Sequence, residues 1–314
     1  MSNARSAVVF AYHDVGARCL RVLLAHGIDV ALVVTHDDDP RENIWFERVA
    51  DVAASNGLTA ITPADPNAPA VVARIAGRTP DFLFSFYYRS MLGTDILALP
   101  SRGALNMHGS LLPKYRGRAP VNWAILHGER HTGATLHYMT AKPDAGDIVA
   151  QQAVPILPDD TALEVFRKVT VAAEIALDAV LPALMAGTAP RSPQDLAQGS
   201  YFSGRKPEDG RIDWSQSAQQ IHNLVRAVAP PYPGAFTTIT GVSARILRTR
   251  VVDPTSPATD APTLELRDGQ ITAHCGSGGT LAIDALELDG DRVDPTSLTL
   301  RFGRTRISLR RSEQ

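Results

Sequence analysis

The first half of the chain alternates short apolar runs with amphipathic stretches, and this alternation constrains the fold more than any other feature. The run "SAVVFAY" (6–12) is followed by a turn at Gly16 and by "ARCLRVLLAHG" (17–27), which has helical periodicity and closes at a glycine. "DVALVVTH" (29–36) then repeats the strand pattern. Strands that alternate with helices predict a parallel, doubly wound α/β sheet, whose ligands usually bind at the carboxyl ends of the strands.

The same pattern continues to about residue 187. A helix is expected over 43–57, and two buried strands over 81–88 and 103–108. The segment 135–156 reads as two strands joined by a turn around Pro143 to Gly146. Thr161 and Glu164 have the spacing of a capping box and predict the start of a long helix.

A change of composition after this helix predicts a second domain. The segment 189–205 is rich in proline, glycine and serine and is expected to be a linker between a first domain, 1–188, and a second, 206–308. Ser217 with Gln220 predicts a helix start, and short β-like runs follow it. The second domain is therefore expected to be small and mostly β.

Composition favours a small-molecule substrate. The chain has 314 residues, a formal net charge of −2 and a pI near 6.5, whereas surfaces that hold nucleic acid or anionic membranes usually carry a basic excess. The first residues lack a secretory pattern and no segment approaches about 18 uninterrupted apolar residues, so a cytoplasmic protein without membrane insertion is expected. Cys19 and Cys275 are isolated, which argues against a disulfide framework or a zinc site.

The segment "ALNMHGSLLPKYRGRAP" (104–120) carries the clearest chemistry. If "ALNMH" is a strand, Asn106 and His108 share one face, roughly 6–7 Å apart, and Met107 points to the other. An amide can hold a developing oxyanion and an imidazole can move a proton, a pairing that suits acyl transfer. Asp144, on the turn "KPDAGD", is the candidate carboxylate to orient the imidazole, in preference to Asp147.

Each of these features also has a purely structural interpretation. A single histidine after a strand is often structural, and His13 in "YHDVG" sits where a strand-to-helix turn commonly holds capping residues. That turn lacks the G-x-G-x-x-G pattern of dinucleotide sites. The cations Lys114, Arg116 and Arg118 are equally compatible with a solvated loop.

Two longer motifs resemble the formyltransferase family that uses 10-formyltetrahydrofolate. "NMHGSLLPKYRGRAP" is similar to its signature Asn-x-His-x-Ser-x-Leu-Pro-x-x-x-Gly, and "TLHYMTAKPDAGDIV" supplies the downstream Asp-x-Gly turn. The resemblance continues through "FAYHDVG", "FSFYYR", "RKPEDGRIDW" and "RAVAPPYPGAF", nearly the whole chain. It implies a Rossmann-like catalytic domain and a smaller, mostly β, barrel-like C-terminal domain.

The resemblance also implies roles for individual residues. Asn106 would stabilise the transition state, His108 would transfer the proton, and Asp144 would raise the basicity of His108. Binding of the folate donor would involve Ser90, Met91, Leu92, Arg118, Thr140, Ala141, Lys142, Pro143 and Asp144, with backbone contacts at 90–92 and 140–143. No metal would be required.

Within the family, the sequence is most similar to a domain that formylates UDP-4-amino-4-deoxy-L-arabinose, so transfer of a formyl group to the amine of a nucleotide-linked aminosugar is expected. That relative is fused to a decarboxylating dehydrogenase; here the decarboxylation is expected to need a separate protein. Methionyl-tRNA formylation is the main alternative, although the segment "THDDDPRENIWFERV" (35–49) is acidic where a tRNA enzyme would carry a basic insertion. A non-catalytic folate-binding module is a third possibility.

Overall fold

The computed structural model describes residues 5–309 and divides them into two compact units. The first unit comprises residues up to 120 together with 131–155 and 166–203. The second comprises 121–130, 156–165 and the residues from 204 onward. Each unit takes in segments that are distant in sequence. The domain boundaries at 188 and 206 stay predictions, because a division by contacts does not establish which segments fold independently.

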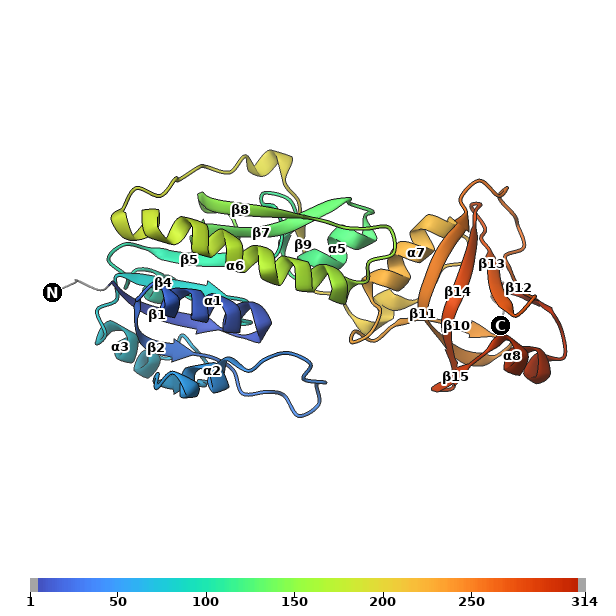
Figure 1. The fold of residues 1–314 in the computed structure, drawn as a ribbon, viewed down its shortest axis with the longest axis horizontal. Coiled ribbons are helices and arrows are strands. Elements are labelled where there is room, and N and C mark those ends of the chain that lie inside the picture. Colours follow the sequence, from blue (N-terminus) through green and yellow to red (C-terminus); the bar gives the residue numbers. More distant parts are fainter. Residues whose placement is uncertain (1–4, 310–314) are drawn as a thin grey trace. The chain divides into compact units, whose positions relative to one another are not determined.

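The first unit is built on a seven-stranded sheet (Figure 1). In spatial order its strands are β3 (Ala60–Ile61), β2 (Asp29–Val34), β1 (Ser6–Ala11), β4 (Phe82–Phe86), β5 (Ala104–His108), β7 (His131–Tyr138) and β8 (Ile148–Pro155). Pairing is parallel from β3 to β5 and antiparallel from β5 to β8. The predicted doubly wound, mostly parallel sheet is confirmed, with an antiparallel hairpin at one edge.

Helices cover both faces of this sheet, which explains its continuous apolar strands. Val8 and Phe10 of β1 pack in one cluster with Ile75 of α3 (Pro69–Ala76) and Ile96 of α4 (Thr94–Leu97). On the opposite face, α1 (His13–Ala25) approaches β1 so closely that a Cβ at Gly16 would lie 3.1 Å from the Cβ of Ala11.

A long helix, α6 (Ala162–Ala186), contacts α1 through an ion pair between Glu174 and Arg18 (Figure 1). Its predicted capping box is present: Thr161 N–H donates to Oε2 of Glu164 at 2.7 Å, and Glu164 N–H donates to Oγ1 of Thr161 at 3.4 Å. Among residues 5–309, α6 is the one helix long and apolar enough to cross a membrane, but half of that apolar window is buried inside the protein. Core helices commonly share these properties.

The helix expected over 43–57 is much shorter than predicted. Only α2 (Val49–Ser55) is helical. The preceding Trp45 and Phe46 pack around the ring of His13, with centroid distances of 4.6 and 3.9 Å. These contacts with the first strand-to-helix turn outweigh the local helical pattern.

The second unit contains a curled antiparallel sheet, which confirms the predicted mostly β, barrel-like architecture (Figure 1). Its strands in spatial order are β10 (Ala235–Ile239), β11 (Val242–Asp253), β14 (Thr280–Leu288), β13 (Gln270–His274), β12 (Thr263–Arg267) and β16 (Arg306–Ser308), with β15 (Asp291–Val293) paired to β14. Ser217 and Gln220 form the predicted capping box at the start of α7 (Ala218–Ala227). A further helix, α8 (Pro295–Phe302), begins at an Asp294 cap that the sequence analysis did not identify.

Candidate active site

Asn106 and His108 lie at the carboxyl end of β5, as the strand prediction requires. Met107 points to the opposite face and is 1% exposed, so it anchors the strand in the core. His108 is also buried, whereas Asn106 is half-buried and accessible to a ligand. The strand thus fixes an amide and an imidazole side by side at the edge where parallel sheets bind ligands.

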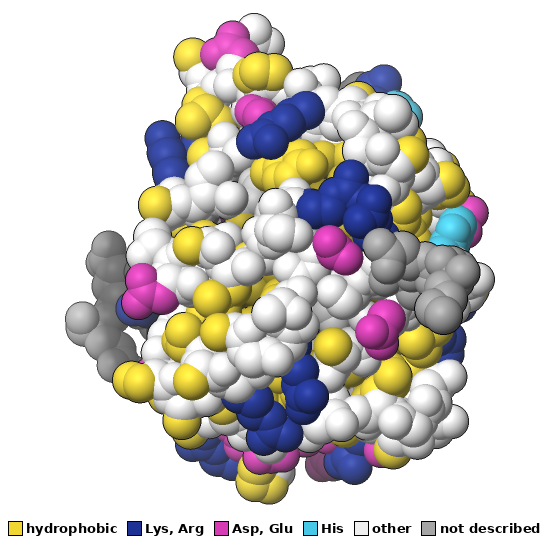
Figure 2. Space-filling view, turned by 90° about the vertical axis from the view of Figure 1, so that its left-hand side faces the viewer, with side chains coloured by type: hydrophobic (Ala, Val, Ile, Leu, Met, Phe, Trp, Pro, Cys, Tyr) yellow, Lys and Arg dark blue, Asp and Glu magenta, His cyan; other side chains and the backbone are white. Residues whose placement is uncertain are grey.

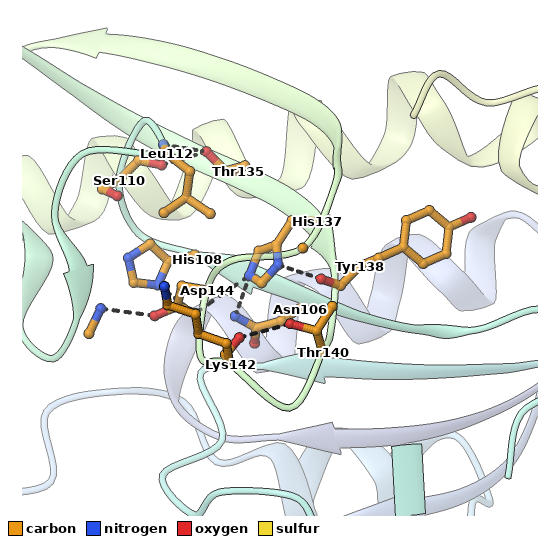
Figure 3. Close-up of polar contacts among 12 residues, drawn as sticks. Asn106, His108, Ser110, Leu112, Thr135, His137, Tyr138, Thr140, Lys142 and Asp144 are labelled. Atoms are coloured by element: carbon orange, nitrogen blue, oxygen red, sulfur yellow. Dashed lines mark hydrogen bonds and ion pairs between the residues drawn. The ribbon is translucent and has the colours of Figure 1, made fainter. Parts of the chain in front are cut away.

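Asp144 reaches this pair from the loop between β7 and β8. Its Oδ1 lies 3.5 Å from Nδ1 of His108, and its Oδ2 accepts a hydrogen bond of 2.9 Å from the amide of Gly117 (Figure 3). The backbone of Asp144 has φ 50°, a left-handed conformation that aspartate tolerates better than most residues.

Gly146, within the loop, and Gln194, outside it, hold the β7–β8 loop in this shape. A Cβ at Gly146 would lie 2.0 Å from the backbone oxygen of Tyr138, so only glycine fits there. Gln194 donates from Nε2 to the backbone oxygens of Asp144 and Gly146, at 3.1 and 2.6 Å. Asp147 points elsewhere and pairs with Arg191 at 2.7 Å. The structure therefore brings Asp144, and not Asp147, to His108.

Both ring nitrogens of His108 face hydrogen-bond acceptors. Nε2 lies 2.8 Å from the backbone oxygen of Tyr115; because a carbonyl oxygen can only accept, Nε2 carries a proton. Nδ1 faces Asp144. A second proton bound at Nδ1 would therefore also be stabilised, and this is the property required of a group that takes up and returns a proton during a reaction.

Burial and charge act on the pKa values of this pair in opposite directions. Burial lowers the pKa of His108 below its ordinary value, and the raising effects of Asp144 and the Tyr115 carbonyl offset this only in part. Burial raises the pKa of Asp144, but the two neighbouring histidines and the Gly117 amide outweigh it and hold that pKa well below its usual range. Asp144 is thus a stable carboxylate. Its effect on His108 has the expected sign, although burial determines the net direction.

His137 is a further site residue that the sequence analysis did not identify. It lies on β7 directly opposite Asn106 in the antiparallel register and is 1% exposed. Its Nδ1 lies 2.8 Å from the backbone oxygen of Tyr138 and therefore donates, while its Nε2 lies 3.2 Å from Nδ2 of Asn106 and 3.5 Å from Oδ1 of Asp144 (Figure 3). In the neutral ring Nε2 accepts from Asn106, which leaves the second N–H of that amide for a ligand.

Replacing His137 with phenylalanine should lower kcat by about 3- to 10-fold with little change in KM, because the hydrogen bond that orients Asn106 and the contact with Asp144 are lost. The measurement is steady-state kinetics alongside a thermal melt. His131→Phe, at the exposed start of the same strand, is the matched control. Equal kinetics for both variants would show that His137 has only a structural role.

The three cations of the 104–120 segment have different environments. Arg116 is buried on the short strand β6 (Arg116–Gly117), so the solvated-loop interpretation is wrong for this residue. Lys114 and Arg118 are exposed, as that interpretation expects.

The residues expected to bind folate lie on two loops and at one further position. Ser90, Met91 and Leu92 follow the carboxyl end of β4, and their loop is braced by Asn67, which donates to the Met91 backbone oxygen at 3.0 Å. Residues 140–143 lie in the β7–β8 loop beside Asp144, where Thr140 Oγ1 donates to the Lys142 backbone oxygen at 2.9 Å (Figure 3). Arg118 follows β6. Their role in folate binding stays a prediction.

His13 is not part of this arrangement. It is packed between aromatic rings, and burial lowers its pKa to about 3, with a further lowering effect of Arg89. Such a histidine stays neutral near neutral pH, which agrees with a structural role. Among residues 5–309, no cluster of three or more His, Cys, Asp or Glu side chains has an arrangement that could hold a metal ion.

Two family models together match most of the chain. The model described as "Formyl transferase" matches residues 8–181, and the model described as "Formyl transferase, C-terminal domain" matches residues 205–301. The first match contains Asn106, His108, His137 and Asp144.

Solved structures with the same fold have low sequence identity to this chain. An N-formyltransferase from Helicobacter canadensis, in complex with folinic acid and dTDP-3-aminofucose, has 18% identity and a TM-score of 0.72, over 92% of this chain and 100% of that one. WlaRD, a sugar 3N-formyl transferase solved with dTDP and 5-N-formyl-THF, has 17% identity and a TM-score of 0.71 over the same shares. HypX from Aquifex aeolicus, solved with tetrahydrofolic acid, has 18% identity and a TM-score of 0.61 over 93% of this chain and 46% of that one.

Proposed function

We propose that this formyl-transferring enzyme moves the formyl group of 10-formyltetrahydrofolate to the amine of a nucleotide-linked aminosugar. The premise is that the chain belongs to the formyl transferase family. The observation that carries the proposal is the convergence of Asn106, His108 and Asp144 at the carboxyl end of β5. The folinic acid and dTDP-3-aminofucose of the Helicobacter canadensis N-formyltransferase, and the dTDP and 5-N-formyl-THF of WlaRD, support it as an analogy.

The proposed reaction uses the side chains as follows. The neutral amine attacks the formyl carbon, a new C–N bond forms, and the second N–H of Asn106 holds the developing oxyanion. His108 accepts the amine proton at Nδ1, the nitrogen that is not already donating, and Asp144 stabilises the doubly protonated ring. The same proton is returned to the folate nitrogen as its bond to the formyl carbon breaks. Holding both substrates together lowers the reaction barrier by several kcal/mol. In well-oriented systems this contribution reaches about 7–11 kcal/mol.

The environment of the expected donor site fits a folate. Met91 is 60% exposed next to the buried Leu92, so an apolar surface remains available on that loop for a flat ring system. Residues 140–143 precede Asp144 in the β7–β8 loop, where their backbone groups would serve polar atoms of the ring. The donor would thus bind between the loop that follows β4 and the loop that follows β7.

The proposed acceptor is UDP-4-amino-4-deoxy-L-arabinose. The resemblance is to the formyltransferase domain of the bifunctional polymyxin-resistance enzyme, whose product is used in lipid A modification. The motifs that carry it are "HGSLLPKYRGRAP" and "KPDAGDIV". We place the reaction in the cytoplasm, as expected for an acceptor that is an activated nucleotide sugar.

Charge distribution argues for this acceptor over a tRNA. The acidic segment after β2 carries ion pairs: Asp38 contacts Arg48 of the same segment at 2.5 Å, and Glu42 contacts Arg89, which follows β4, at 2.8 Å. Figure 2 draws the end of the first unit where β1 begins, which is not the end that carries Asn106 and His108; on that face too, lysine and arginine side chains are scattered among acidic and apolar ones. Binding of a polyphosphate chain usually needs a continuous basic surface.

The test is to incubate the protein with 10-formyltetrahydrofolate and a panel of UDP- and dTDP-linked aminosugars, and to follow tetrahydrofolate release. Rapid release with one sugar, most strongly with UDP-4-amino-4-deoxy-L-arabinose, is expected. Activity should depend weakly on salt, since a tRNA acceptor would make several phosphate contacts and lose affinity steeply as salt rises. His108→Ala is the inactive control.

Two outcomes would overturn the proposal. Formylation of charged initiator tRNA, with no activity on any aminosugar, would identify the acceptor as a tRNA. Tight folate binding without formyl loss to any acceptor would identify a non-catalytic module.

A further inference from the structure

A short strand from outside both motifs lies against the catalytic segment. The strand β9 (Tyr201–Phe202) pairs in parallel with β6, so that Arg116 lies opposite Tyr201 and Gly117 opposite Phe202. Both strands belong to the first unit, although the sequence analysis assigned β9 to the linker.

Hydrogen bonds along this pairing hold residues 115–118. The amide of Tyr115 donates to Oγ of Ser200 at 2.9 Å, and the amide of Arg116 donates to the Ser200 backbone oxygen at 3.0 Å. The amide of Arg118 donates to the Phe202 backbone oxygen at 3.0 Å. The rings of Tyr115 and Phe202 also stack, with centroids 5.5 Å apart and planes at 17°.

The approach of the two segments is close enough to require glycine on both sides. A Cβ at Gly117 would lie 2.1 Å from the backbone oxygen of Phe202, and a Cβ at Gly199 would lie 2.3 Å from that of Pro113. Because backbone atoms cannot move aside as a side chain can, the contact fixes the position of the 115–118 backbone.

The segment held in this way supplies one bond to each member of the catalytic pair. The Tyr115 carbonyl accepts from His108 Nε2, and the Gly117 amide donates to Asp144 Oδ2. The Tyr115 carbonyl determines which nitrogen of His108 carries the first proton, and the Gly117 amide favours the ionised form of Asp144.

We infer that Ser200 and Phe202 are positioning residues for proton transfer: they set the Tyr115 carbonyl and the Gly117 amide against His108 and Asp144. The inference rests on the proposed function only for the role of His108 in turnover. The geometric part, an effect of β9 on the protonation of His108, can be tested without any substrate.

The main test compares Ser200→Ala with Ser200→Thr, which keeps the hydroxyl, and with Ser192→Ala, which removes an exposed hydroxyl from the same stretch. The imidazole titration of His108 is followed by NMR, with its signal assigned through a His108→Asn variant. In Ser200→Ala the Tyr115 amide loses its side-chain acceptor, so the carbonyl of the same residue is held less firmly against His108. The protonated imidazole is then stabilised less, and the pKa of His108 should fall further. Ser200→Thr and Ser192→Ala should titrate like the parent.

Turnover provides the second readout. Ser200→Ala should lower kcat by about 3- to 10-fold, the effect of one hydrogen bond, while KM for both substrates stays within about 2-fold. The acidic limb of the kcat profile should move to lower pH. Phe202→Leu, which removes the stacking with Tyr115 and keeps the backbone bond to Arg118, should change titration and kcat in the same direction and serves as the second variant if Ser200→Ala does not fold.

The outcomes separate the two proposals. An unchanged His108 titration and unchanged kcat in folded Ser200→Ala, or in folded Phe202→Leu if only that variant folds, would overturn the inference about β9. A shifted titration in an enzyme whose parent form formylates none of the aminosugars would support the inference and refute the proposed function.

Discussion

Asp144→Asn is expected to lower kcat by about 10²- to 10⁴-fold, the range for a positioned acid–base group. The substitution keeps the size and the acceptor oxygen that the Gly117 amide needs, and asparagine tolerates the left-handed backbone at φ 50°. It removes the negative charge that lies beside Nδ1 of His108 and Nε2 of His137. The loss should therefore reflect a weaker and less well aligned base, not a misfolded loop.

The pH profile of Asp144→Asn has a definite sign. Asp144 raises the pKa of His108, although burial keeps the net value below the ordinary one. Without the charge, that pKa falls further and the acidic limb of kcat moves to lower pH. The substrate amine also titrates, so the limb reports a macroscopic pKa, and a substrate of different amine basicity will separate the two contributions.

Asp147→Asn is the matched control, because Asp147 lies three residues away and pairs with Arg191. It should retain nearly full activity. If Asp144→Asn instead keeps both its plateau and its limb while His108→Ala is inactive, Asp144 has only a role in the turn.

Asn106→Ala should lower kcat by about 10²- to 10³-fold, the loss expected when one oxyanion donor is removed. Binding of both substrates should change little, because the second N–H of Asn106 would act mainly on charge that develops in the transition state. The measurements are kcat and KM for each substrate, together with calorimetric binding of tetrahydrofolate.

Asn56→Ala controls for the loss of an asparagine elsewhere in the first unit, where Nδ2 of Asn56 donates to the Val52 backbone oxygen at 2.8 Å. It should have parental kinetics. A kcat for Asn106→Ala within a few-fold of the parent would contradict the oxyanion role.

Much of this arrangement follows from local sequence pattern. The apolar runs predict the strands because both faces of the sheet are covered, and strand alternation alone places Asn106 and His108 on one face. Asp144 is different: its side chain meets His108 only because the β7–β8 loop folds back. The turn "KPDAGD" made Asp144 a candidate in preference to Asp147, and the resemblance to a family supported that choice, but no local pattern records the contact itself.

Other features depend on contacts that no local pattern records. His137 faces Asn106 because of the register between β5 and β7, and register is a property of two strands. β9 has only two paired residues in a segment rich in turn formers, too few for a strand pattern. The helix expected over 43–57 is shorter in the structure because Trp45 and Phe46 pack against His13, and these are tertiary contacts.

The β7–β8 loop imposes different kinds of selection on two nearby positions. At Gly146 a Cβ would meet the backbone of Tyr138, so every other residue is excluded by space alone, whether or not the protein catalyses anything. At position 144 the left-handed backbone accepts aspartate and asparagine with little difference, so the backbone conformation does not distinguish them and only the charge that faces His108 and His137 does. In a library of variants, the exchange of these two residues at 144 therefore reports on that charge, whereas invariance of Gly146 carries no information about chemistry.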